Sequence, residues 1–221
     1  MRLRNVKGAG DVLEASPFVI KEPSALRGRW AQEFGREAPI WIEIGMGKGR
    51  FLMEQAALHA DTDFIGVEMY ASVLVRAAQK LKDMPGPEGV NIRLLNVPAE
   101  TLPDILAPCE VQKIFLNFSD PWPKTKHAKR RLTSPEHLRL YEKFLEPGGE
   151  LEFKTDNVEL FEYSLASLRD SAWELVFCSY DIHGERLPGV VKDPEVMTEY
   201  ELRFVENGQK ICKLKAVYPG V

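Results

Sequence analysis

A dense group of chemically useful side chains lies between Asn117 and Lys124. It contains an acid, Asp120, and an aromatic residue, Trp122, that stands between two prolines and is followed by the lysine. Prolines fix the local backbone, so the acid and the lysine are expected to be held in place. Trp122 could stack on a nucleic-acid base, a contact worth about 1–3 kcal/mol, or pack against the helix that follows.

A basic run begins at the end of this group. Residues 124–131 read KTKHAKRR, with five Lys or Arg and no acid, whereas the whole chain of 221 residues has 29 Lys+Arg against 33 Asp+Glu. The net charge of −4 therefore combines a body of −9 with one loop of +5. Such a run is often only a solvated surface or a helix start, but its position beside Trp122 favours contact with a polynucleotide. The acidic total excludes a simple polycation that coats nucleic acid.

Three more polar groups are each expected to follow a strand. Residues 43–49 read EIGMGKG, a glycine turn that either lets a ligand approach the backbone or merely joins a strand to a helix; its spacing is not the dinucleotide G-x-G-x-x-G. Glu68 could accept hydrogen bonds from the hydroxyls of a ribose or stabilise a helix start. Asn96 could pair with the edge of an adenine or form a simple turn or cap. Together the three groups favour an adenosine site.

Two later segments complete the set of candidates. Residues 152–157 bring a second acid, Asp156, to the end of a predicted strand, where it would face the same crevice as Asp120. Residues 197–201 read MTEYE and precede the terminal strand. They could form an ordinary helix cap or a loop that folds over a ligand.

The elements that must position these groups alternate along the chain. Strands are predicted at 40–44, 63–68, 90–95, 113–118, 150–155, 173–180 and about 210–217, and helices at 50–59, 71–82, 99–106, after the cap Ser134, and at 158–170. This alternation predicts an α/β fold with a mostly parallel sheet, which binds ligands at the carboxyl ends of its strands. Residues 1–39 are predicted to be an N-terminal extension, and residues 40–221 one domain.

The remaining composition excludes several other classes. The longest run without a charge has seven residues, 69–75, whereas a membrane span needs about 20 apolar residues, and the first residues lack a secretory signal. Three scattered cysteines, Cys109, Cys178 and Cys212, fit thiols in a reducing cytoplasm. Neither they nor the four histidines have the spacing of metal ligands. We therefore expect a cytoplasmic protein without a metal and without a membrane partner.

Taken together, these motifs resemble those of the bacterial tRNA (guanine-N7-)-methyltransferases. The resemblance runs from about Ile40 to the C-terminus and is most specific in Asn117 to Arg131, in Lys-Thr-Asp at 154–156 and in Thr-Glu-Tyr-Glu at 198–201. It implies the class I S-adenosylmethionine-dependent methyltransferase fold, which is Rossmann-like, with a seven-stranded, mostly parallel sheet, an antiparallel last strand and helices on both faces. It also implies methyl transfer to N7 of the variable-loop guanine, position 46, of tRNA, by a monomer or a homodimer.

The same resemblance implies roles for individual residues. It places S-adenosylmethionine against Glu43, Gly45, Gly47, Glu68, Asn96 and Asp120, with Asp120 also catalytic. It places the substrate against Lys124, Asp156, Thr198, Glu199, Tyr200 and Glu201, and the RNA against Lys126, His127, Ala128, Lys129, Arg130 and Arg131.

The implied chemistry needs no strong base. Guanine N7 has a lone pair and no hydrogen, so positioning and electrostatics must supply the rate. Asp120 or Asp156 could accept hydrogen bonds from N1–H and the exocyclic amine as positive charge develops on the purine. Methyltransferases that act on amino groups have a second proline where this chain has Trp122. Two other hypotheses are a nucleotide-dependent oxidoreductase, which the G-x-G-x-G spacing disfavours, and an RNA-binding scaffold without activity.

Overall fold

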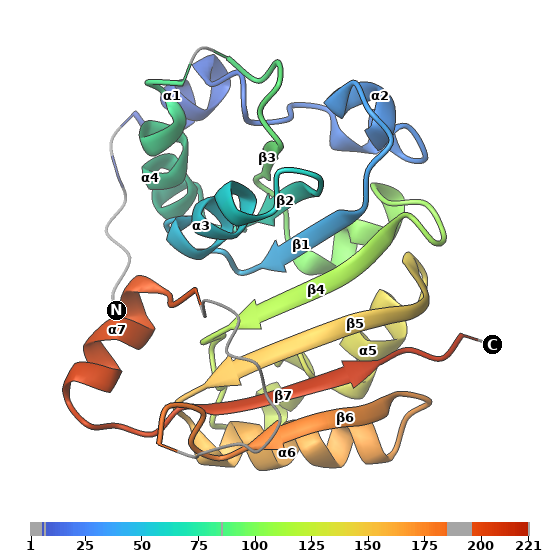
Figure 1. Cartoon of the computed structure of the whole chain (residues 1–221), viewed down its shortest axis with the longest axis vertical. Helices are drawn as coiled ribbons and strands as arrows, with labels where there is room; N and C mark the ends of the chain where they lie inside the picture. The colour runs from blue at the N-terminus through green and yellow to red at the C-terminus, as the bar shows by residue number, and fades with distance from the viewer. Residues whose placement is uncertain (1–5, 7, 85, 185–195, 221) are drawn as a thin grey trace.

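One seven-stranded sheet runs through the molecule, with strand order β3-β2-β1-β4-β5-β7-β6 (Figure 1). The computed structural model describes residues 6, 8–84, 86–184 and 196–220. The strands are β1 (Ile40–Ile44), β2 (Asp63–Val67), β3 (Ile92–Leu95), β4 (Val111–Asn117), β5 (Leu145–Thr155), β6 (Glu174–Ser179) and β7 (Cys212–Val217). β7 is antiparallel to both of its neighbours, and the pairs from β3 to β5 are parallel. The predicted sheet is confirmed.

Helices cover both faces of this sheet and enclose two hydrophobic cores. The helices are α1 (Ala9–Ala15), α2 (Trp30–Phe34), α3 (Arg50–Leu58), α4 (Ala71–Leu81), α5 (Pro135–Tyr141), α6 (Val158–Arg169) and α7 (Glu199–Glu206). Successive side chains of a strand point to opposite faces. On β2, Phe64 accordingly packs into the core that contains α1 and α4, whereas Ile65 packs into the core that contains α5 and α6. All five residues of β2 are buried, as a strand covered on both faces requires.

The segment before β1 packs against the sheet. Phe18, Val19 and Trp30 are buried, and the backbone N–H of Ile20 donates to the carbonyl of Leu94 on β3 at 3.0 Å. α1 lies along α4 (Figure 1). The division into residues 1–39 and 40–221 remains a prediction, but the described part of the first segment contributes to both cores.

Most predicted elements are found within two residues of their expected bounds. β5 begins at Leu145, five residues before the predicted start at 150, because Leu145 already pairs with Val111 of β4. The segment predicted as a helix at 99–106 is a 3-10 helix, η2 (Ala99–Asp104), because Pro103 inside it cannot donate an α-helical hydrogen bond. Part of the basic run forms another 3-10 helix, η3 (Thr125–Arg130). The predicted cap at Ser134 is confirmed, since its side chain accepts from the backbone N–H of His137. Among the helices of the described residues, none is long and apolar enough to span a membrane.

α7 was not among the predicted helices, although a helix cap was one of the two interpretations of residues 197–201. The Thr198 side chain accepts from the backbone N–H of Glu201, and the Glu201 side chain accepts from the backbone N–H of Thr198. This reciprocal capping box marks a helix start. The helix-cap interpretation of residues 197–201 is therefore confirmed. Figure 1 shows α7 beyond the carboxyl ends of the central strands, to which the arrowheads of β1, β4 and β5 point.

Candidate active site

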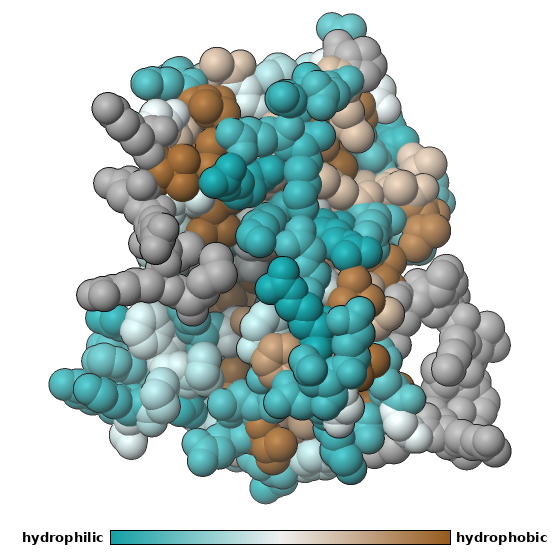
Figure 2. Space-filling model, turned by 90° about the vertical axis from the view of Figure 1, so that its left-hand side faces the viewer, coloured by the Kyte–Doolittle hydropathy of each residue, from teal (hydrophilic) through white to brown (hydrophobic). Residues whose placement is uncertain are grey.

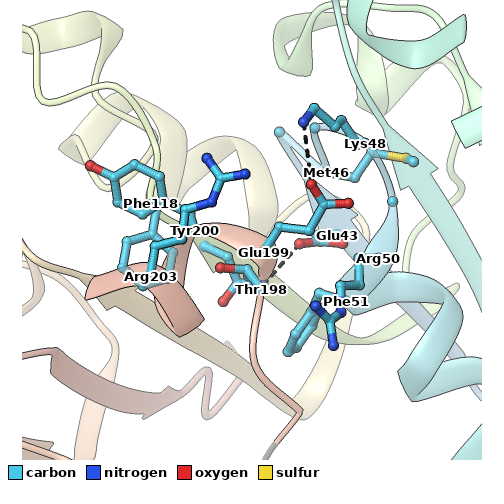
Figure 3. Close-up of a pocket in the computed structure, with 14 residues that line it drawn as sticks. Glu43, Met46, Lys48, Arg50, Phe51, Phe118, Thr198, Glu199, Tyr200 and Arg203 are labelled. Atoms are coloured by element: carbon cyan, nitrogen blue, oxygen red, sulfur yellow. Dashed lines mark hydrogen bonds and ion pairs between the residues drawn. The ribbon is translucent and has the colours of Figure 1, made fainter. Parts of the chain in front are cut away.

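A pocket of about 260 Å³ opens where β1 and β4 end and α7 begins. Its lining consists of residues 45–49 with Glu43, Arg50 and Phe51 from the β1–α3 region, Asn117 and Phe118 from the end of β4, and Thr198, Glu199, Tyr200 and Arg203 from α7 and its cap. Figure 3 shows the α7 residues facing the β1–α3 residues across this space. Figure 2, which looks onto this side of the molecule, shows that hydrophilic residues cover much of it.

The glycine turn brings backbone groups to the pocket. Gly45 and Gly47 have φ of 77° and 59°, a conformation that side-chain-bearing residues rarely adopt. The backbone N–H of Gly47 donates to a carboxylate oxygen of Glu68 at 3.2 Å. The turn therefore connects the end of β1 to the acid that follows β2, as the expected adenosine site requires.

Glu43 and Asn117 form a buried polar pair at the bottom of the pocket. The Asn117 side-chain amide donates to Oε1 of Glu43 at 2.9 Å, and the two residues are only 7% and 2% exposed. The other two acceptors, Glu43 Oε2 and Asn117 Oδ1, are buried and have no hydrogen-bond partner. Burial raises the pKa of Glu43 to about 8, although the hydrogen bond from Asn117 lowers it in part. Two unpaired buried acceptors in one cavity fit a ligand group that is cationic and carries several N–H donors.

The acid after β2 is held by backbone groups. Besides the bond from Gly47, Oε1 of Glu68 accepts from the backbone N–H of Tyr70 at 2.9 Å. Burial raises the pKa of Glu68, and the nearby charge of Asp120 adds to this rise. The side-chain amide of Asn96 donates to the backbone carbonyls of Glu68 and Met69 at 2.8 and 3.2 Å. The ends of β2, β3 and β4 thus meet, whereas the contacts of Glu68 and Asn96 with ribose and adenine stay predictions.

The loop that carries Asp120 departs from ordinary backbone geometry. Phe118 and Trp122 have φ of 52° and 39°, and such strain is found where the surrounding structure enforces it. One constraint is the backbone N–H of Phe118, which donates to the carbonyl of Lys154 at 2.9 Å. Asp120 itself is exposed. The lining of the pocket does not include Asp120, which lies close enough to Glu68 to raise its pKa.

Trp122 packs on the basic run. Its ring meets the ring of His127 edge-on at 5.7 Å, and the Arg130 guanidinium lies 4.9 Å from its centre. Trp122 therefore packs against the helix that follows it, as one of its two interpretations predicted, and this helix is the 3-10 helix η3. The Arg131 side chain donates to the backbone carbonyls of Pro121 and Trp122 at 2.9 and 3.2 Å, so it stabilises the loop that contains Trp122.

Most cations of the run are exposed, including Arg130, which packs on Trp122. Lys124, Lys126, Lys129 and Arg130 are exposed, whereas His127, Ala128 and Arg131 are half-buried. The Arg131 guanidinium also lies 4.2 Å from the centre of the Tyr163 ring. The predicted RNA-contacting residues therefore divide into an exposed group and a group that also shapes the loop.

α7 covers one side of the pocket and forms ion pairs with the glycine turn and with α4 on the opposite side. Glu199 forms ion pairs with Lys48 in the glycine turn at 3.2 Å and with Lys80 on α4 at 2.9 Å. The Tyr200 ring lies 5.1 Å from that of Phe118. Burial, together with the negative charge of the nearby Asp156 carboxylate, raises the pKa of the Tyr200 hydroxyl. The structure thus brings the predicted substrate segment and Asp156 together.

Three further residues of this region were not predicted to act. Asn117, Phe118 and Lys154 lie at the carboxyl ends of β4 and β5, beside the predicted acids. Their positions at or next to the strand ends were visible in the sequence. Their pairing with Glu43, Tyr200 and Glu201 was not, because it depends on how distant segments meet.

The fold and the pocket at the ends of β1 and β4 define the class I S-adenosylmethionine-dependent methyltransferase fold. The 16S rRNA methyltransferase KamB superimposes with a TM-score of 0.62 at 17% identity, over 86% of this chain and 93% of that chain. A 16S rRNA (adenine(1408)-N(1))-methyltransferase from Catenulisporales acidiphilia, solved with its cosubstrate, gives a TM-score of 0.59 at 16% identity, over 86% and 90%. Similarity at this level shows the fold.

Sequence relatives show the family. A family model described as "Putative methyltransferase" matches residues 37–214. The tRNA (guanine-N(7)-)-methyltransferase of Geobacillus thermodenitrificans (strain NG80-2) is 47% identical over 220 residues, 99% of this chain and 98% of the relative. The enzyme of that name from Bacillus subtilis (strain 168) is 44% identical over 214 residues, 96% of this chain and 97% of the relative. The chain belongs to the bacterial tRNA (guanine-N7-)-methyltransferase family.

Proposed function

We propose that the protein transfers a methyl group from S-adenosylmethionine to N7 of the variable-loop guanine, position 46, of tRNA. The observation that carries this proposal is the pair of unpartnered buried acceptors, Glu43 Oε2 and Asn117 Oδ1, in a pocket next to the loop of Asp120 and η3. Family membership supports the same reaction. We place the activity in the cytoplasm and expect a monomer or a homodimer.

The cofactor fits the residues that line the pocket. Glu43 and Asn117 would accept hydrogen bonds from its ammonium group, and the backbone of Gly45 and Gly47 would lie against it. Glu68 and Asn96 would hold its ribose and adenine. When bound, S-adenosylmethionine supplies an electrophilic methyl group on a sulfonium.

Asp120 is the residue we propose to act on the guanine. Its carboxylate would accept hydrogen bonds from N1–H and the exocyclic amine, and these bonds strengthen as the purine becomes positive. Asp156 lies close to Tyr200 of α7, and its negative charge contributes to the raised pKa of the Tyr200 hydroxyl. In this proposal the exposed Asp120 meets the base, and Asp156 orients Tyr200 beside Phe118. No proton has to be removed from N7, so the site needs no general base.

The exposed cations of η3 would bind the phosphate backbone of the RNA. Lys124 and Lys126 follow the Asp120 loop directly, so an RNA that crosses η3 presents a base to that loop. The body of the protein is acidic and would repel RNA elsewhere.

Incubating the purified protein with tRNA and methyl-labelled S-adenosylmethionine tests the proposal. We expect label in 7-methylguanosine after digestion to nucleosides. Label in another nucleoside would refute the site of transfer. Absence of label, with cofactor binding measured by calorimetry, would favour an RNA-binding scaffold.

A further inference from the structure

A buried ion pair fastens the first turn of α7 to the central sheet. Lys154 stands near the end of β5 and is 1% exposed, and Glu201 on α7 is 0% exposed. The lysine Nζ lies 3.3 Å from both carboxylate oxygens of Glu201 and donates to the carbonyl of Val196 at 3.3 Å. Lysine and glutamate are almost never fully buried unless they are paired. This contact is therefore a specific feature of how α7 is placed.

Glu201 also organises the helix start itself. Its Oε2 accepts from the backbone N–H of Thr198 at 3.3 Å, and its own N–H donates to the Thr198 hydroxyl at 2.9 Å. Its Oε1 lies 3.0 Å from Nε2 of His183, which follows β6. One carboxylate thus joins the cap of α7 to β5 and to the segment after β6.

The turn that this carboxylate holds is the part of α7 that lines the pocket. Thr198, Glu199 and Tyr200 all line the pocket, and in Figure 3 Glu199 reaches across to Lys48 whereas Tyr200 lies beside Phe118. Lys154 also adjoins the pocket, because its Nζ lies 5.8 Å from the centre of the ring of Phe51, which lines it. Burial raises the pKa of Glu43, and the charge of Lys154 opposes that rise. The lysine therefore contacts both α7, through Glu201, and the lining of the pocket, through Phe51.

The energetics of burial indicate why a charged pair stands here. Moving two charges out of water costs several kcal/mol each, and a well-packed apolar pair of similar size is often equally stable. A charged pair instead fixes one geometry, because its hydrogen bonds are directional. The placement of the α7 cap is therefore the property that this pair is expected to control.

We propose that Lys154 is a positioning residue for methyl transfer: through its ion pair with Glu201 it seats the first turn of α7, and with it Thr198 and Tyr200, at the mouth of the pocket. The proposal rests on the proposed function. It gives Glu201, which the resemblance assigns to the substrate, a supporting role instead.

Two variants remove the ion pair in different ways. Lys154→Met removes the cation and keeps a long side chain. Glu201→Gln removes the anion and keeps the capping box, which accepts Gln as well as Glu at this position. Lys113→Met is the matched control, because Lys113 is a largely buried lysine on β4 that pairs with Glu150 and Glu152 at 3.0 and 3.6 Å.

Hydrogen exchange and kinetics on the full chain then separate positioning from stability. We expect amides 199–206 to exchange at least 10-fold faster in Lys154→Met and Glu201→Gln, with kcat/KM for tRNA at least 10-fold lower. Lys113→Met should change the Tm without either effect. Measurements are made below the Tm of every variant, and if Lys154→Met does not fold, Glu201→Gln decides.

Unchanged exchange of α7 in the charge-removing variants would overturn the proposal, and so would faster exchange with wild-type kcat/KM. A wild-type protein that does not methylate tRNA would refute the proposed function. The exchange measurement would then still show whether the pair seats α7.

Discussion

At the residue scale, Asp120 is the group on which the proposed chemistry depends most. Asp120→Ala should lower kcat by about 10²–10³-fold, the cost of removing one preorganised transition-state contact. The tRNA Kd should stay within about twofold, because phosphate contacts dominate affinity. Asp104→Ala, at an exposed acid on η2, is the control. A fully active Asp120→Ala variant would remove this residue from the mechanism.

The buried carboxylate of Glu43 predicts an unusual dependence of stability on pH. Burial raises its pKa from 4.5 to about 8. Between these values the unfolded chain ionises while the folded protein keeps the proton, so this residue lowers the free energy of unfolding as pH rises. Below pH 4.5 it is protonated in both states and contributes no such loss.

Glu43→Gln should therefore raise the Tm, by an amount that grows from pH 5 to pH 8 and reaches about 5–10 °C. Glu54→Gln, at a partly exposed i,i+4 pair with Arg50, serves as the comparison. Thermal unfolding followed by circular dichroism across this pH range gives the difference. A Tm difference that does not change with pH would mean that Glu43 is ionised in the folded protein throughout.

At the scale of elements, η3 is expected to carry the electrostatic part of RNA binding. Five phosphate contacts would give a slope of log K against log salt of about −3.5 to −4.5. Replacing Lys126, Lys129 and Arg130 by Ala should flatten this slope by about 2–3, and Arg131 is left in place because it supports the Trp122 loop.

The control is the same loss of charge on other helices, made by changing Arg139, Lys143 and Arg169 to Ala. These residues are exposed on or next to α5 and α6. Filter binding of tRNA from 50 to 200 mM salt gives both slopes. If the η3 variant keeps the wild-type slope, or the control loses as much, the RNA site lies elsewhere.

The elements also show where sequence patterns succeed. β1 and β2 are short, mostly buried strands that end beside a glycine or a helix start. Their apolar and β-branched residues predicted both ends of each strand to within one residue. α1 was missed because it has seven residues and Gly8, without a capping side chain, at its start. α7 was not assigned as a helix although Thr198 and Glu201 carry the capping-box spacing, which is the signal that would have found it.

At the scale of the whole molecule, the alternation of elements predicted a mostly parallel sheet, and the resemblance implied its antiparallel last strand; both are confirmed. Parallel strands bring the ends of β1, β2 and β4 to one edge, so Glu43, Glu68 and Asp120 were expected there together. The pairing of Glu43 with Asn117 and of Lys154 with Glu201 was not foreseen. Such contacts join residues far apart in the chain, and periodicity does not specify them.

Charge distribution ties the molecule to its proposed substrate. The chain carries −4 overall, with +5 concentrated in residues 124–131. In the structure this segment follows the Asp120 loop directly and packs on it through Trp122. One basic face on an acidic body favours docking of RNA in a single orientation.

The central claim is methyl transfer to N7 of one guanine, and it is tested most directly by two tRNA transcripts that differ in one atom. One has guanosine at position 46 of the variable loop, and the other has 7-deazaguanosine there, in which N7 is replaced by C–H. With labelled S-adenosylmethionine, we predict one methyl group per molecule, recovered as 7-methylguanosine, on the first transcript and none on the second. Equal labelling of both transcripts would contradict the account.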